Sequence, residues 1–463
     1  MKLFLFDKKN LIELKNINLK QYKLKKKNEI LQSDEPWGSR TNGYYTVIKD
    51  KDKVLMYYRC SYSIGKEEKH GLTSKCSCCV SNTCIAISYD NGITFQRKIN
   101  DKKNNILFNK KCISHNFTVF KDKNNSLMGI GGLHTWPNFH TVCYKNEKTI
   151  NFNGKNIADP REYHPCYCNG IHLLKSHNIF EWDNIQKTPI ISGLHKGQTD
   201  NRNGWGWSEF DGMSTCLYSK VLNKYFIYCR SNIRNGIRSI QYTTSNDLIN
   251  WDKFKLINID PKLNVNNLEN YYYLNVVEDF ESKTFLGFSP YNNSNISYIT
   301  LLYSNNGSDW KKISNILDST VSNKRSSSQN ANNFILSSDN KEYYFYINEN
   351  YFSLTDTKSL PRLVRYSIRK DGFCSVFSNN GYVKINIGKS SKIKINYKTY
   401  ENGYIVIEDI EFKNSIEKVN IKLEGDEIDK SVDLYENNYS NKNTNNKILK
   451  IKIINSEIFT VTI

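Results

Sequence analysis

The chain repeats one pattern of hydrophobic and polar positions five times. In each copy an apolar and aromatic run is followed by a short polar segment and then by a second apolar run. Two apolar runs joined by turn-forming residues are typical of an antiparallel β-hairpin. The five predicted hairpins span residues 44–59, 117–132, 213–230, 273–290 and 333–348.

A second motif follows the first four hairpins, after one further apolar run. It has a serine at its start, preceded by Thr244 in the third copy, continues with Asn, Asp or Gly, and ends with a large aromatic residue. The copies are residues 88–95, 176–182, 244–251 and 304–310, which end in Phe95, Trp182, Trp251 and Trp310. Because a buried aromatic ring contributes a large apolar area, we predict that these four residues pack between neighbouring units of the fold.

Each hairpin, with the strand after it and the strand after the motif, makes a unit of about four strands. The units begin near residues 44, 117, 213, 273 and 333. Four-stranded sheets repeated around an axis form a β-propeller. The sequence therefore predicts an all-β fold with a five-bladed β-propeller. A large two-sheet sandwich is the alternative, and it explains the fivefold repeat less well.

The pattern changes after Gly381 to a regular alternation of apolar and polar residues, separated by turns rich in Asn and Ser. This is the period of antiparallel strands with one face in water. We predict an antiparallel β-sandwich over residues 377–463. The propeller then takes residues 1–376, of which 1–33 form a leading strand and an approach segment. No helix longer than a turn or two is expected.

The composition narrows the partners and the location. The net charge is +19, from 65 basic and 46 acidic residues, but the lysines are scattered, so nucleic acid is not expected as a partner. No run of 18 apolar residues exists, so no membrane span is predicted. The apolar patch at residues 3–6 is too short for a signal peptide, which predicts synthesis in the cytosol. Incorporation into a virus particle or display on a surface stays open, as does the oligomeric state.

The cysteines do not predict a metal site. The chain has 12 cysteines, five of them between Cys60 and Cys84 and two more at Cys166 and Cys168. Zinc sites usually pair their ligands as C-x₂₋₄-C, a spacing that the adjacent Cys78 and Cys79 do not fit well. Free thiols, disulfides and a metal site all stay open for the two clusters, which we interpret as loop insertions.

Six segments together resemble the five-bladed propeller enzymes of glycoside hydrolase families 32, 43 and 68. They are residues 3–13, 34–59, 114–122, 210–230, 269–277 and 362–376, which correspond in order to the opening strand, the first four blades and the passage into the sandwich. The resemblance covers nearly the whole chain. It implies a propeller followed by a β-sandwich, with a carbohydrate as the ligand. No cofactor is expected, and a calcium ion in the channel stays open.

Candidate catalytic residues come from the starts of the innermost strands, which line the channel of a propeller. Asp34 and Glu35 precede the first blade, Asp211 the third and Glu269 the fourth. Glycoside hydrolysis needs two carboxyl groups, one ionised and one protonated. The resemblance gives Asp211 and Glu269 the positions of family carboxylates, and either Asp34 or Glu35 is the candidate from blade one.

Four further residues are predicted to contact the ligand. His115 precedes the second blade, and Arg59 and Arg230 end two predicted strands, where they are able to hold a carboxylate or a sugar. Trp37 lies in a loop before the first blade, where its ring is able to stack on a sugar face. No metal-binding residues are predicted.

Two functions follow from the resemblance and from the departures from it. The first is a glycoside hydrolase-like enzyme with carboxylates as general acid/base and nucleophile. The alternative is a non-catalytic carbohydrate-binding or structural surface protein, such as a virion protein. Residues 33–38 read SDEPWG where the families have Asn-Asp-Pro, the Arg-Asp-Pro and Glu-Cys signatures of family 32 are absent, and blade five offers no acid. Both functions stay open.

Overall fold

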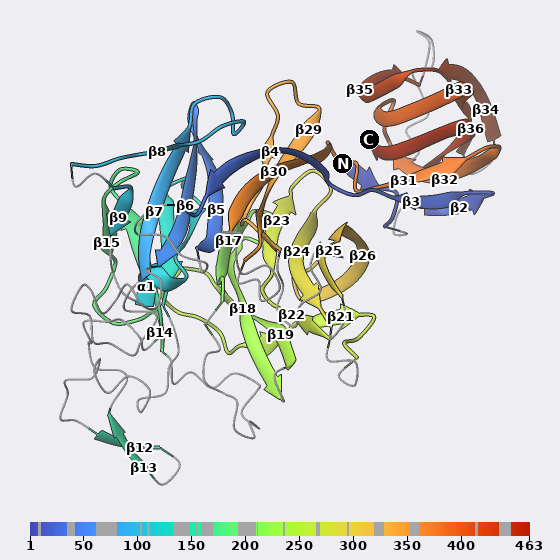
Figure 1. Ribbon diagram of the computed structural model, residues 1–463. Helices are drawn as coiled ribbons and strands as arrows, with labels where there is room; N and C mark the ends of the chain where they lie inside the picture. Colours follow the sequence, from blue (N-terminus) through green and yellow to red (C-terminus); the bar gives the residue numbers. More distant parts are fainter. Residues whose placement is uncertain are drawn as a thin grey trace.

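The computed structural model consists almost entirely of β-strands (Figure 1). It describes residues 1–7, 11–34, 42–61, 81–101, 104–108, 112–132, 149–152, 155–158, 170–192, 210, 212–234, 237–264, 269–293, 296–318, 328–351, 361–412, 415–434 and 446–463. The helix found in this part of the chain is the single turn α1 (Cys112–His115). None of its helices is long and apolar enough to cross a membrane.

Five mainly antiparallel sheets form the blades of a propeller, as the sequence predicts. Blade one contains β5 (Gly43–Asp50), β6 (Lys53–Ser61), β7 (Ser81–Ser88), β8 (Gln96–Arg97) and β9 (Ile106–Phe108). Blade two contains β10 (Thr118–Lys121), β11 (Leu127–Gly131), β14 (Gly170–Ser176), β15 (Trp182–Asn184) and β16 (Ile191–Ser192). The hairpin β12 (Thr149–Phe152) and β13 (Lys155–Ala158) forms a separate small sheet between β11 and β14 in the sequence.

The other three blades follow in chain order. Blade three contains β17 (Thr215–Ser219), β18 (Lys224–Arg234), β19 (Ile237–Ser245) and β20 (Lys255–Leu256). Blade four contains β21 (Asn258–Asp260), β22 (Asn270–Tyr271), β23 (Asn275–Asp279), β24 (Thr284–Asn292), β25 (Ser297–Ser304) and β26 (Asp309–Asp318). Blade five contains β27 (Gln329–Asn330), β28 (Ile335–Leu336), β29 (Glu342–Glu349), β30 (Arg362–Arg369) and, from the start of the chain, β4 (Lys25–Gln32).

The blades form a closed ring because each neighbouring pair shares one hydrophobic core. Blades one and two share a core around Tyr57, and blades two and three share one around Ile227. Blades three and four pack around Trp310, and blades four and five around Phe288. The core around Met56 joins blade one to blade five. Five shared cores around five sheets rule out the two-sheet sandwich for this part of the chain.

The Trp-ended motifs pack between blades, as predicted. In three motifs the final aromatic ring meets a tyrosine of the preceding blade edge to face: Phe95 meets Tyr346, Trp182 meets Tyr57 and Trp310 meets Tyr228, with centroids 5.5, 5.6 and 5.9 Å apart. The hydroxyls of the same tyrosines donate to backbone carbonyls of the motifs, at Gly92, Ile179 and Gly307. Edge-to-face packing and a satisfied phenol favour burial of such pairs.

Trp251 follows this arrangement less completely. It packs against the core shared by blades two and three, but it stays half-buried. Blade two carries Ile130 opposite Thr118, at the position where blade one has Tyr57 opposite Thr46. An aliphatic side chain offers neither a phenol nor an aromatic face to the motif, and this accounts for the greater exposure of Trp251.

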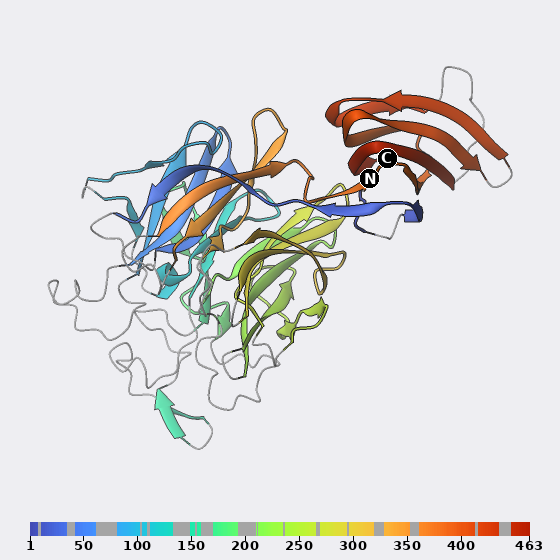
Figure 2. The same cartoon turned by 45° about the vertical axis from the view of Figure 1, so that its right-hand side comes forward.

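The C-terminal module is one nine-stranded antiparallel sheet that bends around its own core (Figure 2). The long strands β33 (Lys392–Phe412) and β36 (Lys447–Thr462) pair with each other through its centre. On the far side of β33 lie β34 (Ser415–Leu423) and β35 (Asp426–Asp433). On the far side of β36 lie β31 (Cys374–Ser378) and β32 (Gly381–Gly388). Alternating isoleucines, such as Ile451 and Ile453, fill the core, as the alternation predicts.

The sheet pairing corrects the expected domain boundaries. Strands β1 (Lys2–Phe4), β2 (Leu11–Lys15) and β3 (Asn18–Gln21) pair with β36, β32 and β31 of the C-terminal module. The assignment of residues 1–33 to the propeller is therefore wrong for these three strands. Only β4 pairs with a blade, where it adds the outer strand of blade five beside β30. The physical reason is that the side chains of β2 and β3 are almost all exposed, so neither strand buries a face that would specify one sheet edge over another.

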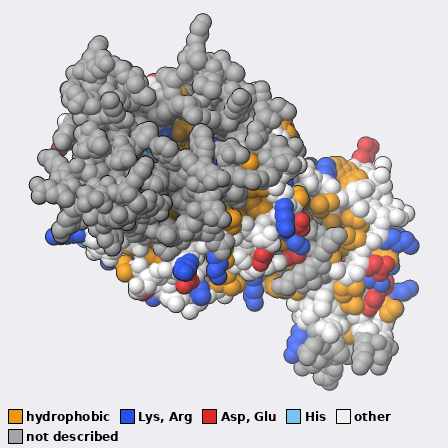
Figure 3. All heavy atoms as spheres, turned by 90° about the horizontal axis from the view of Figure 1, so that it is seen from below, with side chains coloured by type: hydrophobic (Ala, Val, Ile, Leu, Met, Phe, Trp, Pro, Cys, Tyr) orange, Lys and Arg blue, Asp and Glu red, His pale blue; other side chains and the backbone are white. Residues whose placement is uncertain are grey.

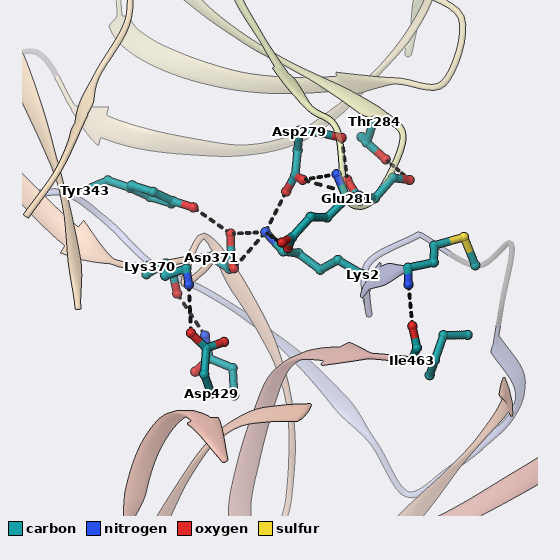
Figure 4. Close-up of polar contacts among 12 residues, drawn as sticks. Lys2, Asp279, Glu281, Thr284, Tyr343, Lys370, Asp371, Asp429 and Ile463 are labelled. Atoms are coloured by element: carbon teal, nitrogen blue, oxygen red, sulfur yellow. Dashed lines mark hydrogen bonds and ion pairs between the residues drawn. The ribbon is translucent and has the colours of Figure 1, made fainter. Parts of the chain in front are cut away.

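A buried ionic cluster fastens the C-terminal module to the propeller (Figure 4). The ammonium of Lys2 on β1 lies 2.8 Å from an oxygen of Asp279 in blade four and 3.1 Å from an oxygen of Asp371 before β31. Tyr343 of blade five donates a hydrogen bond to Asp371. Beside it, Lys370 binds Asp429 of β35 at 2.8 Å.

Five cysteines are buried: Cys60, Cys84, Cys216, Cys229 and Cys374. Cys84, Cys216 and Cys374 are free thiols, and burial raises the pKa of the Cys374 thiol to about 12. Cys60 and Cys84 lie on adjacent strands of blade one. The remaining cysteines of the two clusters lie outside the described residues. Within the described residues, no three His, Cys, Asp or Glu side chains are placed to hold a metal ion.

Candidate functional site

The site is built around Tyr44, at the mouth of the propeller where the first strand of blade one begins. Tyr44 has φ = 53°, a left-handed conformation that few residues other than glycine adopt. The register of β5 against β6 shifts between Gly43 and Thr46, and an irregularity of this kind re-aims a side chain. Strain of this kind, which costs about 1–3 kcal/mol, collects at functional sites. The ring of Tyr44 packs with Tyr273 and Met213 of blades four and three.

Arg59 lies against the face of Tyr44. The carbon at the centre of its guanidinium is 4.4 Å from the centroid of the tyrosine ring, within cation–π range. One terminal nitrogen is 3.0 Å from Nε2 of His115, and the other donates to the hydroxyl of Tyr351 at 2.8 Å. Burial lowers the pKa of Arg59, but the oxygens of Tyr351 and Tyr44 beside it raise it by more, so that its pKa lies above the ordinary value. Arg59 is therefore charged at every physiological pH.

His115 is positioned by the turn α1 and by the residue after it. Its ring lies edge-on to Tyr44, and its Nδ1 is 3.3 Å from the hydroxyl of Ser81. Asn116 is fully buried, and its amide nitrogen donates to the carbonyls of Phe210 and Gly212 at 2.6 and 3.2 Å. This one amide therefore fixes the end of α1 against the chain that leads into blade three.

Tyr272 extends the site toward blades three and four. Its hydroxyl is 3.1 Å from the hydroxyl of Tyr44. The guanidinium groups of Arg230 and Arg238 lie 5.6 and 5.4 Å from the centroid of its ring. Arg230 lies within β18 and is buried, and its backbone carbonyl accepts a hydrogen bond from the side-chain amide of Gln241. Two tyrosines and three arginines are thus in contact across three blades.

Blade five closes the ring of residues around Tyr44. Tyr351 follows β29, and its ring centroid is 6.4 Å from that of Tyr44. Asn348 donates to the carbonyl of Asn42 at 2.9 Å. Gly43 passes beneath them, and a Cβ atom there would lie 3.0 Å from the ring of Tyr351. Figure 3 looks onto this face of the propeller, and hydrophobic and Lys or Arg side chains are visible in a recess of it.

The predicted site residues separate into three groups. Arg59 and His115 come together at 3.0 Å, and Arg230 joins them through Tyr272 and Tyr44. Glu35, Trp37 and Asp211 lie outside the described residues. The remaining two, Asp34 and Glu269, make contacts elsewhere.

Asp34 and Glu269 were predicted as catalytic carboxylates. Asp34 accepts from Arg97 at 2.8 Å at the outer edge of blade one, with its side chain 55% exposed. Glu269 accepts from the backbone of Asn264 at 2.7 Å. Glu269 also bonds Tyr291, whose pKa is raised by burial and by this carboxylate. None of these contacts belongs to the group around Tyr44 and Arg59.

The tyrosines are the part of the site that the sequence interpretation missed. Tyr44, Tyr272 and Tyr351 were not among the predicted site residues. Their signal was position, because Tyr44 is the second residue of the innermost strand of blade one and Tyr272 lies shortly before the innermost strand of blade four. The rule that selected Asp34 and Glu269 would have selected these tyrosines too if aromatic residues had been included.

No family model and no curated protein sequence matches the chain. Solved structures do match. An N-acetylgalactosamine deacetylase from F. plautii, in complex with blood group B trisaccharide, is 11% identical with a TM-score of 0.44, over 75% of this chain and 95% of that chain. A thermostable family-43 glycoside hydrolase is 14% identical with a TM-score of 0.44, over 73% and 92%. An α-L-arabinanase from Penicillium chrysogenum, complexed with arabinobiose, is 10% identical with a TM-score of 0.41, over 76% and 99%. Sequence identities and TM-scores this low carry no argument about function, which must rest on the side chains at the mouth of the propeller.

Proposed function

We propose that the protein binds a carbohydrate at the mouth of its propeller, through the group of Tyr44, Arg59, His115, Tyr272 and Tyr351. The observation that carries this proposal is the contact of aromatic rings with planar hydrogen-bond donors in one place, held by strained and buried backbone. Such a combination suits a ligand that has apolar CH faces and many hydroxyls, as saccharides do.

The chemistry of the group supports binding over a purely structural role. Pockets for small ligands are lined mostly by apolar and aromatic surface with a few convergent polar groups that set orientation. Tyr272 and Tyr351 keep part of their surface exposed, whereas Tyr44 is buried beneath them. The exposed rings are able to stack on a sugar, and Arg59 and His115 are held rigidly enough to read its hydroxyls.

Binding is tested with a panel of oligosaccharides by isothermal titration calorimetry. Replacement of Tyr272 by Ala removes a partly exposed ring that packs against the cluster of Tyr44, Met213 and Tyr273, and we expect affinity for the bound saccharide to fall tenfold or more. Tyr89→Ala is the matched control, because Tyr89 is 58% exposed on an outer turn of blade one. If the wild type binds no saccharide, or if both variants bind as the wild type does, the proposal fails.

Hydrolysis is the second candidate, and one observation favours it. Asn116, the residue after His115, donates to the carbonyls of Phe210 and Gly212, the two residues that flank the predicted carboxylate Asp211 in the sequence. Hydrolysis needs a second carboxyl group about 5–9.5 Å from the first, and Asp34 and Glu269 are bound elsewhere. Binding is therefore the first proposal. A product released by the wild type and not by Asp211→Asn, with affinity unchanged, establishes the enzyme instead.

A further inference from the structure

Strands β2 and β3 form one continuous edge of the C-terminal module (Figure 1). β32 and β31 lie end to end along β36, and β2 and β3 lie beside them in turn. Asn16, at the junction of β2 and β3, has φ = 54°. Among the described residues, no strand pairs with the outer side of this edge. An edge strand with unpaired backbone groups is a template for pairing with another chain.

Three leucines leave the core of the module uncovered along this edge. Each lies opposite a buried core residue: Leu11 opposite Ile385, Leu14 opposite Val383 and Leu19 opposite Val376. Residues directly opposite each other on antiparallel strands share a face of the sheet, so the leucines belong to the core face. Leu14 and Leu19 are nevertheless 43% and 50% exposed. A further strand along this edge would cover them.

Other edge strands have features that oppose such pairing. The outer strand of blade five, β4, begins with three lysines at positions 25–27, and lysines on an edge repel an incoming strand. β35, at the opposite border of the module, keeps its two apolar residues at least partly buried and exposes charged side chains. β2 instead exposes leucine between one acidic and one basic residue, Glu13 and Lys15. One charge of each sign suits a partner with the same sequence.

We propose that β2 pairs antiparallel with β2 of a second copy of this chain, about a twofold axis at Leu14, and so forms a homodimer. Leu14 then lies opposite Leu14 of the second copy, and Glu13 lies opposite Lys15 in both directions. A register centred on Glu13 would place two carboxylates opposite each other, which is destabilising. A twofold interface uses the same patch in both copies and closes at a dimer. This inference goes beyond the proposed function, because the edge lies on the C-terminal module and not at the mouth.

The two charged residues are placed for such contacts. Glu13 lies opposite Lys384 and Lys15 opposite Tyr382, so both lie on the outer face of the sheet. Glu13 accepts from the hydroxyl of Tyr382 and lies 3.2 Å from the ammonium of Lys384, but its side chain stays 44% exposed. The ammonium of Lys15 lies 5.9 Å from the ring centroid of Tyr382. No described residue forms an ion pair with Lys15, so its charge is available to Glu13 of the second copy.

The shortness of the edge sets the strength of the dimer. β2 has five residues, and pairing along it buries less than the roughly 800 Å² per partner of a standard interface. We therefore expect a weak dimer, with a dissociation constant of about 1–100 µM.

Sedimentation velocity over a range of protein concentrations tests the association. The wild type should pass from monomer to dimer and form no larger species. Glu13→Lys and Lys15→Glu each place like charges opposite each other at both symmetry-related positions, so each should weaken the dimer about tenfold or more. Lys392→Glu is the control, because it makes the same change of charge on β33, where Lys392 pairs with Asp433. It should dimerise as the wild type does.

A mixture of the two β2 variants then tests the register. When Glu13→Lys meets Lys15→Glu, each substituted position lies opposite a residue of opposite charge. A heterodimer should therefore form with nearly wild-type affinity, although neither variant dimerises well alone. A misfolded variant would not be restored in this way. Leu14→Lys places two ammonium groups opposite each other at the axis, and should stay monomeric.

The other outcomes overturn the proposal. A wild type that stays monomeric at every concentration shows that the edge takes no second copy. A mixture that fails to restore the dimer shows that Glu13 does not face Lys15. Equal weakening by Lys392→Glu shows an effect of overall charge instead of pairing along β2, and a dimer that persists in Leu14→Lys places the interface elsewhere.

Discussion

Replacing Lys2 by Met should destabilise the protein by about 3–5 kcal/mol, the usual cost of removing one partner from a buried ion pair. The ammonium of Lys2 is bracketed by carboxylate oxygens of Asp279 and Asp371 at 2.8 and 3.1 Å, and the side chains of Lys2 and Asp371 are 8% and 4% exposed (Figure 4). A methionine fills nearly the same volume but leaves two carboxylates side by side without a cation. The loss falls on the junction that joins β1 to blades four and five.

The same variant should show a defined dependence on pH. Burial raises the pKa of Asp371 above 3.8, and Lys2 acts in the opposite direction. Because the folded pKa lies above the unfolded one, folding takes up a proton between the two values, and the free energy of unfolding rises as the pH falls through that window. Without Lys2 the folded pKa climbs further. The destabilisation should therefore be larger at pH 8 than at pH 5.

Urea unfolding, followed by tryptophan fluorescence at both pH values, measures this. Lys23→Met is the control, because Lys23 pairs with Asp318 of blade four and both side chains are more than half exposed. An exposed pair is worth about 0–1 kcal/mol, so this variant should unfold almost as the wild type does. The reasoning is refuted if Lys2→Met costs less than the control, or if its cost is no greater at pH 8 than at pH 5.

Two further predictions concern the propeller core. Trp310→Ala should lower the free energy of unfolding in urea by about 3–5 kcal/mol, because the ring is 1% exposed between blades three and four. Trp251→Ala should lower it clearly less, because Trp251 is only half-buried. Equal losses of stability in the two variants would contradict the role of the neighbouring tyrosines. The thiol of Cys374, with its pKa raised to about 12 by burial, should resist iodoacetamide in the native protein and react in urea, as read by mass spectrometry of the peptides, and rapid native labelling would contradict its burial.

The propeller was predictable from the sequence because each blade repeats local signals. A hairpin with two apolar runs and a serine-to-tryptophan turn are both written in contiguous residues. The turn is made by its own side chains, as where the hydroxyl of Ser304 accepts from the backbone of Gly307 at 2.9 Å. Signals of this kind need no knowledge of distant residues, so counting them counted the blades.

The partners of the N-terminal strands were not predictable in the same way. β2 pairs with β32 and β4 pairs with β30, across more than 300 residues of chain. Both are edge strands whose side chains are mostly exposed. Register and partner are specified by the face that a strand buries, and a strand that buries little carries little information about its place. Only the three-dimensional structure shows that residues 1–33 are divided between the C-terminal module and the propeller.

The residues of the candidate site, too, were only partly predictable from the sequence. Two of the carboxylates predicted from their position before an inner strand, Asp34 and Glu269, contact neighbours outside the group around Tyr44. Asp34 reaches Arg97, and Glu269 reaches the backbone of Asn264. Tyr44 takes the central place instead, because a register shift beside Gly43 turns it inward beneath Arg59. Local backbone geometry thus sets which side chains the mouth presents, and their aromatic and hydrogen-bonding character makes a saccharide the ligand to test first.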